Sequence, residues 1–240
     1  MVINTALKSK GVYEKKINYH KLHTLDKEVL LIPNKHMGPP KYYENLRMAI
    51  DSLIKEDYYV FYESLKPGEL KSAEDSSEFR TQVMKLRKIL GKSLSSNSSD
   101  GGIFDTINNT IRIGKNTVKL KEKLMSQPSA NYFFKNTGDY EKVDLTITEL
   151  IAEFENRYGE IVLTNCDYTT PMDSEYKCWE TDEVEIVGNM YDEIIVDYRN
   201  RYLVQEILKD KHPKIAVIYG ANHMEGIIEL LEIKGYQKTE

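Results

Sequence analysis

The chain has 240 residues, of which 40% are hydrophobic and 30% charged, and its formal net charge is −5 at pH 7. This length suits one large domain, or one domain with an insertion, and the hydrophobic content is sufficient for a core. The negative charge argues against nucleic-acid binding, which requires a basic face. No apolar stretch approaches the length of a membrane span, and the first 20 residues lack the apolar core of a signal peptide.

The two cysteines leave two alternatives open. Cys166 and Cys178 are not spaced as Cys-x-x-Cys, so a redox or zinc-binding motif has little support. They would form a disulfide in an exported protein and remain free thiols otherwise. As written, the sequence indicates a cytoplasmic protein. A leader preceding it in the natural protein would instead make it exported, or a lipoprotein associated with a membrane through that segment. The oligomeric state is not indicated.

The N-terminal part of the chain predicts a strand followed by a helix. Residues 1–27 are polar and are expected to form an arm or an edge hairpin. Residues 29–33 form an apolar run typical of a buried strand, and His36 lies in the turn after it. In residues 41–56 apolar side chains recur at three and four positions, which predicts an amphipathic helix.

A second strand with one costly residue comes next. Residues 58–65 are rich in aromatic and β-forming residues, and Glu63 lies near the end of this run. A carboxylate in a buried strand is unfavourable unless it is paired or bound to a cation. The two strands and the helix between them are expected to form a right-handed βαβ unit with parallel strands.

Residues 66–143 are expected to be an insertion or a lid. Within them, a helix is predicted for residues 79–90, ended by Gly91, and short strands for residues 110–113 and 132–134. Two stretches rich in turn-forming residues are expected to be loops: 93–102 and 166–180.

The C-terminal part predicts further helices and strands. Thr146 and Glu149 have the spacing of a capping box, which predicts that a helix starts here and ends before Gly159. The remaining expected elements are a strand at 160–164, a long helix from 190 or 192 to 211, a buried strand at 215–220 and a helix at 224–233.

Four residues are candidates for catalysis: His36, Glu63, Arg199 and His223. A His-Met pair follows a buried strand near each end of the chain, which suggests two half-sites brought together by the fold. In α/β sheets, ligands bind outside the carboxyl ends of the strands.

The chemistry of these side chains leaves several alternatives. His36, Glu63 and His223 could hold a divalent metal such as Mn, Co or Zn, or could act as general base and acid without a metal. Arg199 would bind a carboxylate, a phosphate or a developing oxyanion. Each also has a structural interpretation, in which the histidines cap or pack, Glu63 faces water, and Arg199 and Arg201 are solvated charges on a helix.

The motifs around these residues resemble the TraB/GumN/TIKI family, which is related to the erythromycin-esterase and ChaN-like proteins. Residues 220–226 match its strand-Gly-x-x-His-x-x-Gly-helix motif, residues 198–201 resemble its Arg-Asn segment, and Glu63 resembles its strand-end glutamate. Residues 143–164 are similar to bacterial members. Residues 33–36 depart from the family's Gly-Thr-x-His motif, since Pro33 stands in place of the glycine. Proline can neither adopt a positive φ nor donate an amide hydrogen bond, so the backbone path to His36 is expected to differ.

The resemblance covers about residues 28–65 and 143–235. It implies an α/β domain spanning the chain, with a central, mainly parallel sheet flanked by helices and built from two similar halves. It also implies a metal-dependent hydrolase acting on peptides, or a related amide or ester hydrolase, with His36, Glu63, Arg199 and His223 as catalytic residues. One alternative is a non-catalytic protein that binds a peptide or a haem-like small molecule in the same cleft, and another is an interaction or regulatory domain with no small-molecule site. The substrate contacts expected are Asn34, Asn200, Arg201 and Asn222.

Overall fold

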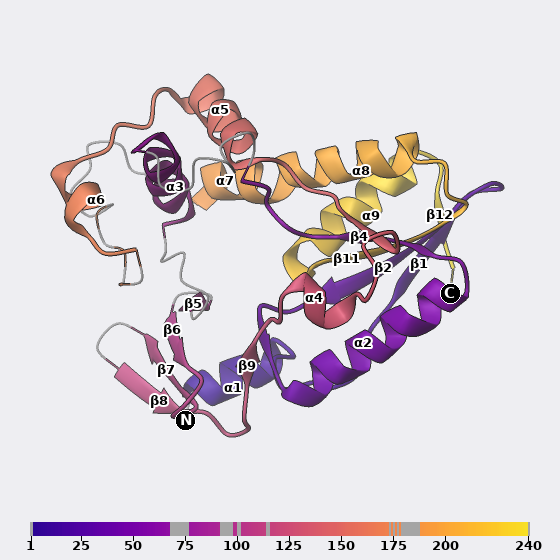
Figure 1. Cartoon of the computed structure of the whole chain (residues 1–240), viewed down its shortest axis with the longest axis horizontal. Helices are drawn as coiled ribbons and strands as arrows, with labels where there is room; N and C mark the ends of the chain where they lie inside the picture. The colour runs from indigo at the N-terminus through magenta and orange to yellow at the C-terminus, as the bar shows by residue number, and fades with distance from the viewer. Residues whose placement is uncertain are drawn as a thin grey trace.

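The computed structural model describes residues 2–67, 77–91, 98–99, 102–113, 116–172, 174, 176, 178 and 188–239. Its centre is a six-stranded sheet with the order β10-β4-β11-β2-β1-β12 (Figure 1). In chain order the strands are β1 (His20–His23), β2 (Glu28–Asn34), β4 (Tyr59–Tyr62), β10 (Tyr140–Lys142), β11 (Lys214–Gly220) and β12 (Gln237–Lys238). The four strands from β10 to β2 are parallel, and β1 is antiparallel to both its neighbours. The expected α/β fold with a mainly parallel sheet is confirmed.

Helices cover both faces of this sheet, with α2 (Pro40–Lys55) on one side and α8 (Arg199–Lys209) and α9 (Met224–Ile233) on the other (Figure 1). Side chains alternate along each strand. In β11, Ala216 and Ile218 pack with the α2 layer, whereas Ile215, Val217 and Tyr219 pack with α8 and α9. Burying one such aliphatic side chain contributes about 1.5–3 kcal/mol. Burial on both faces explains why the strand reads as a continuous apolar run.

The two strands that precede the His-Met pairs are neighbours in the sheet. β11 lies between β2 and β4, and Gly220 at its end is paired with Asn34 at the end of β2. Glu63 follows the end of β4 directly, and its amide donates to the carbonyl of Ile218 at 3.0 Å. Segments from both ends of the chain therefore end at the same edge of the sheet.

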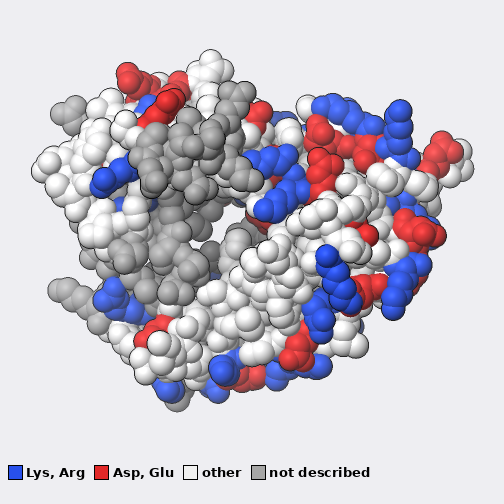
Figure 2. Space-filling view, viewed as in Figure 1, with Lys and Arg blue, Asp and Glu red and all other residues white. Residues whose placement is uncertain are grey.

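Two lobes lie beyond this edge (Figure 1). The first contains α3 (Ser77–Leu90), α5 (Ile147–Tyr158), α6 (Asn165–Thr169), α7 (Gly188–Tyr191) and the π-helical segment η3 (Asp192–Tyr198). The second contains α1 (Val2–Ser9), β3 (Met37–Gly38), β5 (Ser98–Ser99), β6 (Gly102–Asp105), β7 (Thr110–Ile113), β8 (Asn116–Lys119) and β9 (Met125–Ser126). On the face drawn in Figure 2, positive and negative side chains are interspersed.

Each lobe has its own apolar core. Leu86, Phe154 and Ile194 are among the buried residues of the first lobe, and Phe104 and Leu124 are among those of the second. The stretch expected to be an insertion or lid, residues 66–143, supplies parts of both lobes and also β10 of the central sheet. Among the described helices, none combines the length and the apolar character needed to cross a membrane.

Several local predictions are confirmed. The helix predicted for residues 79–90 is α3, and Gly91 ends it with φ +60°. The capping box of α5 is present, with the side chain of Thr146 accepting from the amide of Glu149. The strand predicted for residues 110–113 is β7. The prediction of an arm or an edge hairpin for residues 1–27 holds only in part: residues 2–9 form helix α1, and β1 forms a hairpin with β2 but lies between β2 and β12 rather than at the edge.

Other local predictions are wrong. Residues 132–134 were expected to be a strand, but they fall in and just after the short helix α4 (Ala130–Phe133). Phe133 and Phe134 are buried beside α2, so tertiary packing outweighs the β-propensity of the aromatic residues. Residues 160–164 were also expected to be a strand, but they form none. They connect α5 to α6 within the first lobe, and Ile161 is buried in the core of that lobe. The predicted loop at 93–102 falls largely outside the described residues.

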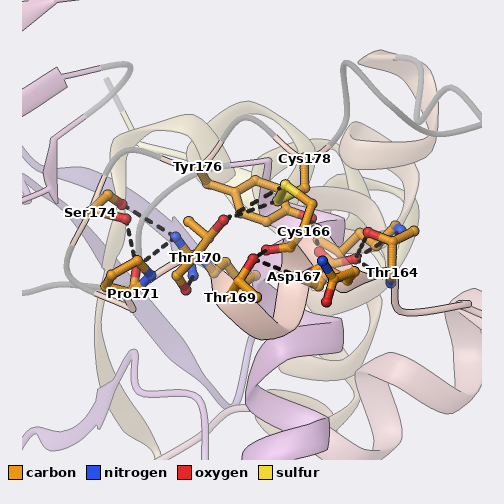
Figure 3. Close-up of a disulfide and its surroundings, with 12 residues drawn as sticks. Thr164, Cys166, Asp167, Thr169, Thr170, Pro171, Ser174, Tyr176 and Cys178 are labelled. Carbon is orange, nitrogen blue, oxygen red and sulfur yellow. Dashed lines mark hydrogen bonds and ion pairs between the residues drawn. A yellow bond between two sulfur atoms is a disulfide. The ribbon is translucent and has the colours of Figure 1, made fainter.

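The long helix predicted from about residue 190 consists of three consecutive pieces, α7, η3 and α8. The loop predicted for 166–180 begins as helix α6, and much of the rest lies outside the described residues. Cys166 in α6 and Cys178 form a disulfide (Figure 3). Arg87 of α3 donates to the carbonyl oxygens of Thr170 and Pro171, each at 2.9 Å. The disulfide therefore closes a loop that is also held to the first lobe by a buried arginine.

Candidate functional site

The site begins with the carboxylate of Glu63 at the end of β4. Its Oε2 accepts a hydrogen bond from the amide of Gly220 at 2.5 Å. A Cβ on residue 220 would lie 3.1 Å from this oxygen, so glycine leaves room for the close approach of the carboxylate. The first glycine of the C-terminal motif thus has a structural role at the site.

Arg199 occupies the centre of the cluster, at the junction of η3 and α8. Only 5% of its surface is exposed. Its Nε donates to Asp144 Oδ1 at 3.0 Å, and its Nη2 donates to Asp144 Oδ2 and to Glu63 Oε1, each at 2.7 Å. Its Nη1 lies 3.3 Å from the carbonyl oxygen of Ile195 and 3.2 Å from His223 Nε2.

These contacts use all five N–H groups of the Arg199 guanidinium. The expected role of Arg199 in holding a negative charge of the substrate does not fit this arrangement, because no donor remains for a ligand. Arg199 instead binds two carboxylates that come from different elements. The cluster of Glu63, Asp144 and Arg199 has a formal net charge of −1, since two acids face one base.

Burial and charge set the ionisation of these groups. Burial by itself would raise the pKa of Glu63, but Arg199 and His223 outweigh it, and the pKa is lowered. For Arg199 burial would lower the pKa, but Asp144 and Glu63 outweigh it, and the pKa is raised. Glu63 and Arg199 are therefore both charged at neutral pH.

His223 is buried, with 5% of its surface exposed. Its Nδ1 lies 2.7 Å from Asn200 Oδ1, and the edge of its ring meets the ring of Tyr219 at a centroid distance of 5.1 Å. Burial and the positive charge of Arg199 lower the pKa of His223 to about 4, and Glu63 opposes this only in part. The ring is therefore neutral at physiological pH.

His36 differs from His223 because it is exposed. It lies between β2 and β3, where its carbonyl oxygen accepts from the amide of Gln127 at 2.8 Å. Its charge is the smallest of the influences that lower the pKa of Glu63 and of His223. The two histidines thus follow neighbouring parallel strands at one edge of the sheet, but only His223 has described contacts within the cluster.

The four residues expected to contact substrate occupy different positions. Asn34 is buried and accepts from the amide of Lys35 through its own Oδ1 at 2.8 Å, as in a turn. Asn200 is also buried, against His223. Asn222 is exposed just before His223. Arg201 is exposed on α8 and lies over the ring of Tyr198, so it is not part of the cluster.

Asp144 is the site residue that the sequence interpretation missed. It is 1% exposed and binds Arg199 through both carboxylate oxygens. It lies between β10 and the capping box of α5, where an acidic residue is usually taken as part of the helix start. The sequence feature that could have revealed Asp144 is an acidic residue just after β10, which ends at the same edge of the sheet as β4. That position becomes evident only when β10 is known to pair with β4.

The residues do not fit the divalent metal that the family resemblance implies. Both oxygens of Glu63 are engaged, by Arg199 and by the Gly220 amide, and His223 Nε2 faces an Arg199 donor. A guanidinium thus occupies the place between carboxylate and imidazole that a cation would need. Among the described residues, no three His, Cys, Asp or Glu side chains are grouped as metal ligands.

Comparisons with models of known protein families, with curated proteins and with solved structures gave no match.

Proposed function

We propose that this chain is a hydrolase of peptide bonds, or of related amide or ester bonds, that acts without a bound metal. The observation that carries the proposal is that an exposed imidazole, His36, and an ionised, rigidly held carboxylate, Glu63, both follow strands that end at the carboxyl edge of the parallel sheet. This is the edge where α/β proteins bind their ligands. The resemblance of residues 220–226 to the TraB/GumN/TIKI motif supports the same reaction class.

In this mechanism His36 is the general base. Its ring takes a proton from water as the water attacks the scissile carbonyl carbon, and the imidazolium then returns the proton to the leaving amine or alcohol. The negative charge of Glu63 stabilises that imidazolium. Arg199 and Asp144 do not touch the substrate; they hold Glu63 ionised and in place. The positive charge of the His36 imidazolium offsets the formal net charge of −1 of the cluster for as long as the imidazolium exists.

The test is hydrolysis of a library of peptides and activated esters by the purified chain. Removal of a general base is expected to lower kcat by about 10²–10⁴-fold, so His36→Ala should show a loss of this size. His212→Ala is the matched control, because His212 is an exposed histidine that precedes β11, at the opposite end of that strand. Equal activity of both variants and the unmodified chain would refute the proposal. Addition of EDTA, and of Mn, Co or Zn, should leave the rate unchanged; strict dependence on one of these ions would contradict the metal-free mechanism.

A second function is favoured by the closed hydrogen bonding of the cluster. The five donors of Arg199 are used within the protein, and so are both nitrogens of His223. Such a preformed floor also suits a protein that binds a peptide or a small molecule without chemical change. Saturable peptide binding that is lost in His36→Ala, with no hydrolysis by any preparation, would favour this alternative.

A further inference from the structure

Asn200 is buried next to Arg199, and its side chain faces the ring of His223. We infer that Asn200 is a positioning residue: its Oδ1 holds His223 as a neutral imidazole that carries its proton on Nδ1, with the bare Nε2 turned to Arg199. The inference deepens the proposed function, because it assigns the two histidines different roles. Its meaning for catalysis rests on that proposed function.

The first argument comes from Arg199. A guanidinium is protonated at all accessible pH values and only donates hydrogen bonds. Since its Nη1 lies 3.2 Å from His223 Nε2, that nitrogen must accept, and the proton of the neutral ring is then on Nδ1. The group 2.7 Å from Nδ1 must in turn be an acceptor, which among the atoms of an asparagine amide is Oδ1. The opposite orientation of Asn200 would place N–H groups against each other.

The second argument comes from Gly226. With Oδ1 on the histidine, the Nδ2 of Asn200 points toward α9, where a Cβ on residue 226 would lie only 2.6 Å away. Glycine at this position therefore makes room for the amide. The last glycine of the motif supports Asn200, just as the first glycine supports Glu63.

The third argument is energetic. Nδ2 of Asn200 is buried and has no hydrogen-bond partner among the described residues. Leaving a buried amide donor unsatisfied costs about 1–3 kcal/mol. For this donor alone, the protein would be at least as stable with an apolar side chain of similar size at position 200. The presence of asparagine is explained by what its oxygen does for His223.

The consequence is a division of roles between the two imidazoles. Both nitrogens of His223 are engaged, so its ring has no lone pair available for water. His223 is then a fixed part of the floor, and the exposed His36 is left as the ring that can move a proton. Asn200 acts on the reaction only through His223.

Nuclear magnetic resonance of ¹⁵N-labelled protein at pH 7.5 tests this without a substrate. We expect the His223 ring to show a protonated Nδ1 and a bare Nε2, with a ring N–H proton protected from solvent. Asn200→Asp keeps an acceptor and should keep this signal. Asn200→Leu has a similar size but no acceptor, and should exchange the proton at least about tenfold faster. Asn222→Leu, at the exposed residue beside His223, is the matched control and should leave the signal unchanged.

A ring protonated on Nε2 in the unmodified protein would overturn the inference, as would unchanged exchange in Asn200→Leu. Far-UV circular dichroism establishes that the variants are folded, and Asn200→Ala replaces the leucine variant if that chain does not fold. The outcome is independent of activity. Absence of hydrolysis together with the expected tautomer would refute the proposed function and leave the positioning role of Asn200 intact.

Discussion

The buried His223 should make the stability of the protein depend on pH in a defined window. In the folded chain its pKa is about 4, whereas the ordinary value is 6.5. The unfolded chain therefore binds a proton at a pH where the folded chain does not, and stability falls as pH falls. The contribution is fully present above pH 6.5 and is lost by about pH 4. The groups that act on this ring are Arg199, Glu63 and His36.

The size of the effect follows from the difference between the two pKa values. The whole difference corresponds to about 3 kcal/mol, since one pKa unit is about 1.4 kcal/mol. About 2 kcal/mol of this should be lost between pH 7.5 and pH 5. The pKa of Glu63 is lowered, so Glu63 stabilises the fold above the ordinary carboxylate range, and this contribution is lost only as the pH falls further. Measurements that stop at pH 5 therefore largely exclude the effect of Glu63.

The assay is urea unfolding followed by far-UV circular dichroism at pH 7.5, 6 and 5, for the unmodified chain and for His223→Gln. Between pH 7.5 and pH 5, the free energy of unfolding of His223→Gln should fall by about 2 kcal/mol less than that of the unmodified chain. This difference does not depend on how much the substitution destabilises the protein at pH 7.5. The comparison removes the effect of His20, whose pKa is also lowered, by burial. Parallel pH profiles for His223→Gln and the unmodified chain would refute the reasoning.

Two further predictions concern the same cluster and use thermal or urea unfolding. Arg199→Met leaves the buried carboxylate of Asp144 and the partly buried carboxylate of Glu63 without their partner and should cost about 3–5 kcal/mol. Arg201→Met, on the exposed side of α8, should change stability by less than about 0.5 kcal/mol. A similar small effect for both would contradict the assignment of a buried ion pair. Gly226→Ala places a Cβ 2.6 Å from Asn200 Nδ2 and should cost about 1–3 kcal/mol. Gly138→Ala, where a Cβ would meet nothing within 4 Å, is the control, and equal melting temperatures would show that the close approach is absent.

Much of the fold could be predicted because burial leaves a periodic trace in the sequence. β2 and β11 are buried on both faces and read as apolar runs, while α2 and α5 bury one face and read as amphipathic helices. The prediction was wrong where packing rather than pattern decides, as in α4, whose aromatic residues are buried beside α2.

The candidate site was predictable only in part. Glu63 and His223 could be placed together because parallel strands bring their carboxyl ends to one edge. The role of Arg199 could not be predicted, because the spacing along a helix does not tell which face meets a carboxylate from another element. Asp144 was missed because the pairing of β10 with β4, which brings it to this edge, could not be inferred from the sequence. The hydrolytic reaction and the family resemblance stay predictions.

The position of β11 in the sheet has a consequence for synthesis of the protein on the ribosome. β2 and β4 are made early, but they pair with each other only through β11, which begins at Lys214. Until that strand emerges, the nascent chain carries two apolar strand edges with no partner between them. Closure of the sheet is therefore a late, non-local step, and it is the same step that brings Gly220 and His223 to Glu63. A chain stalled before residue 214 would lack both its central strand and its site, and would depend on chaperones to avoid aggregation.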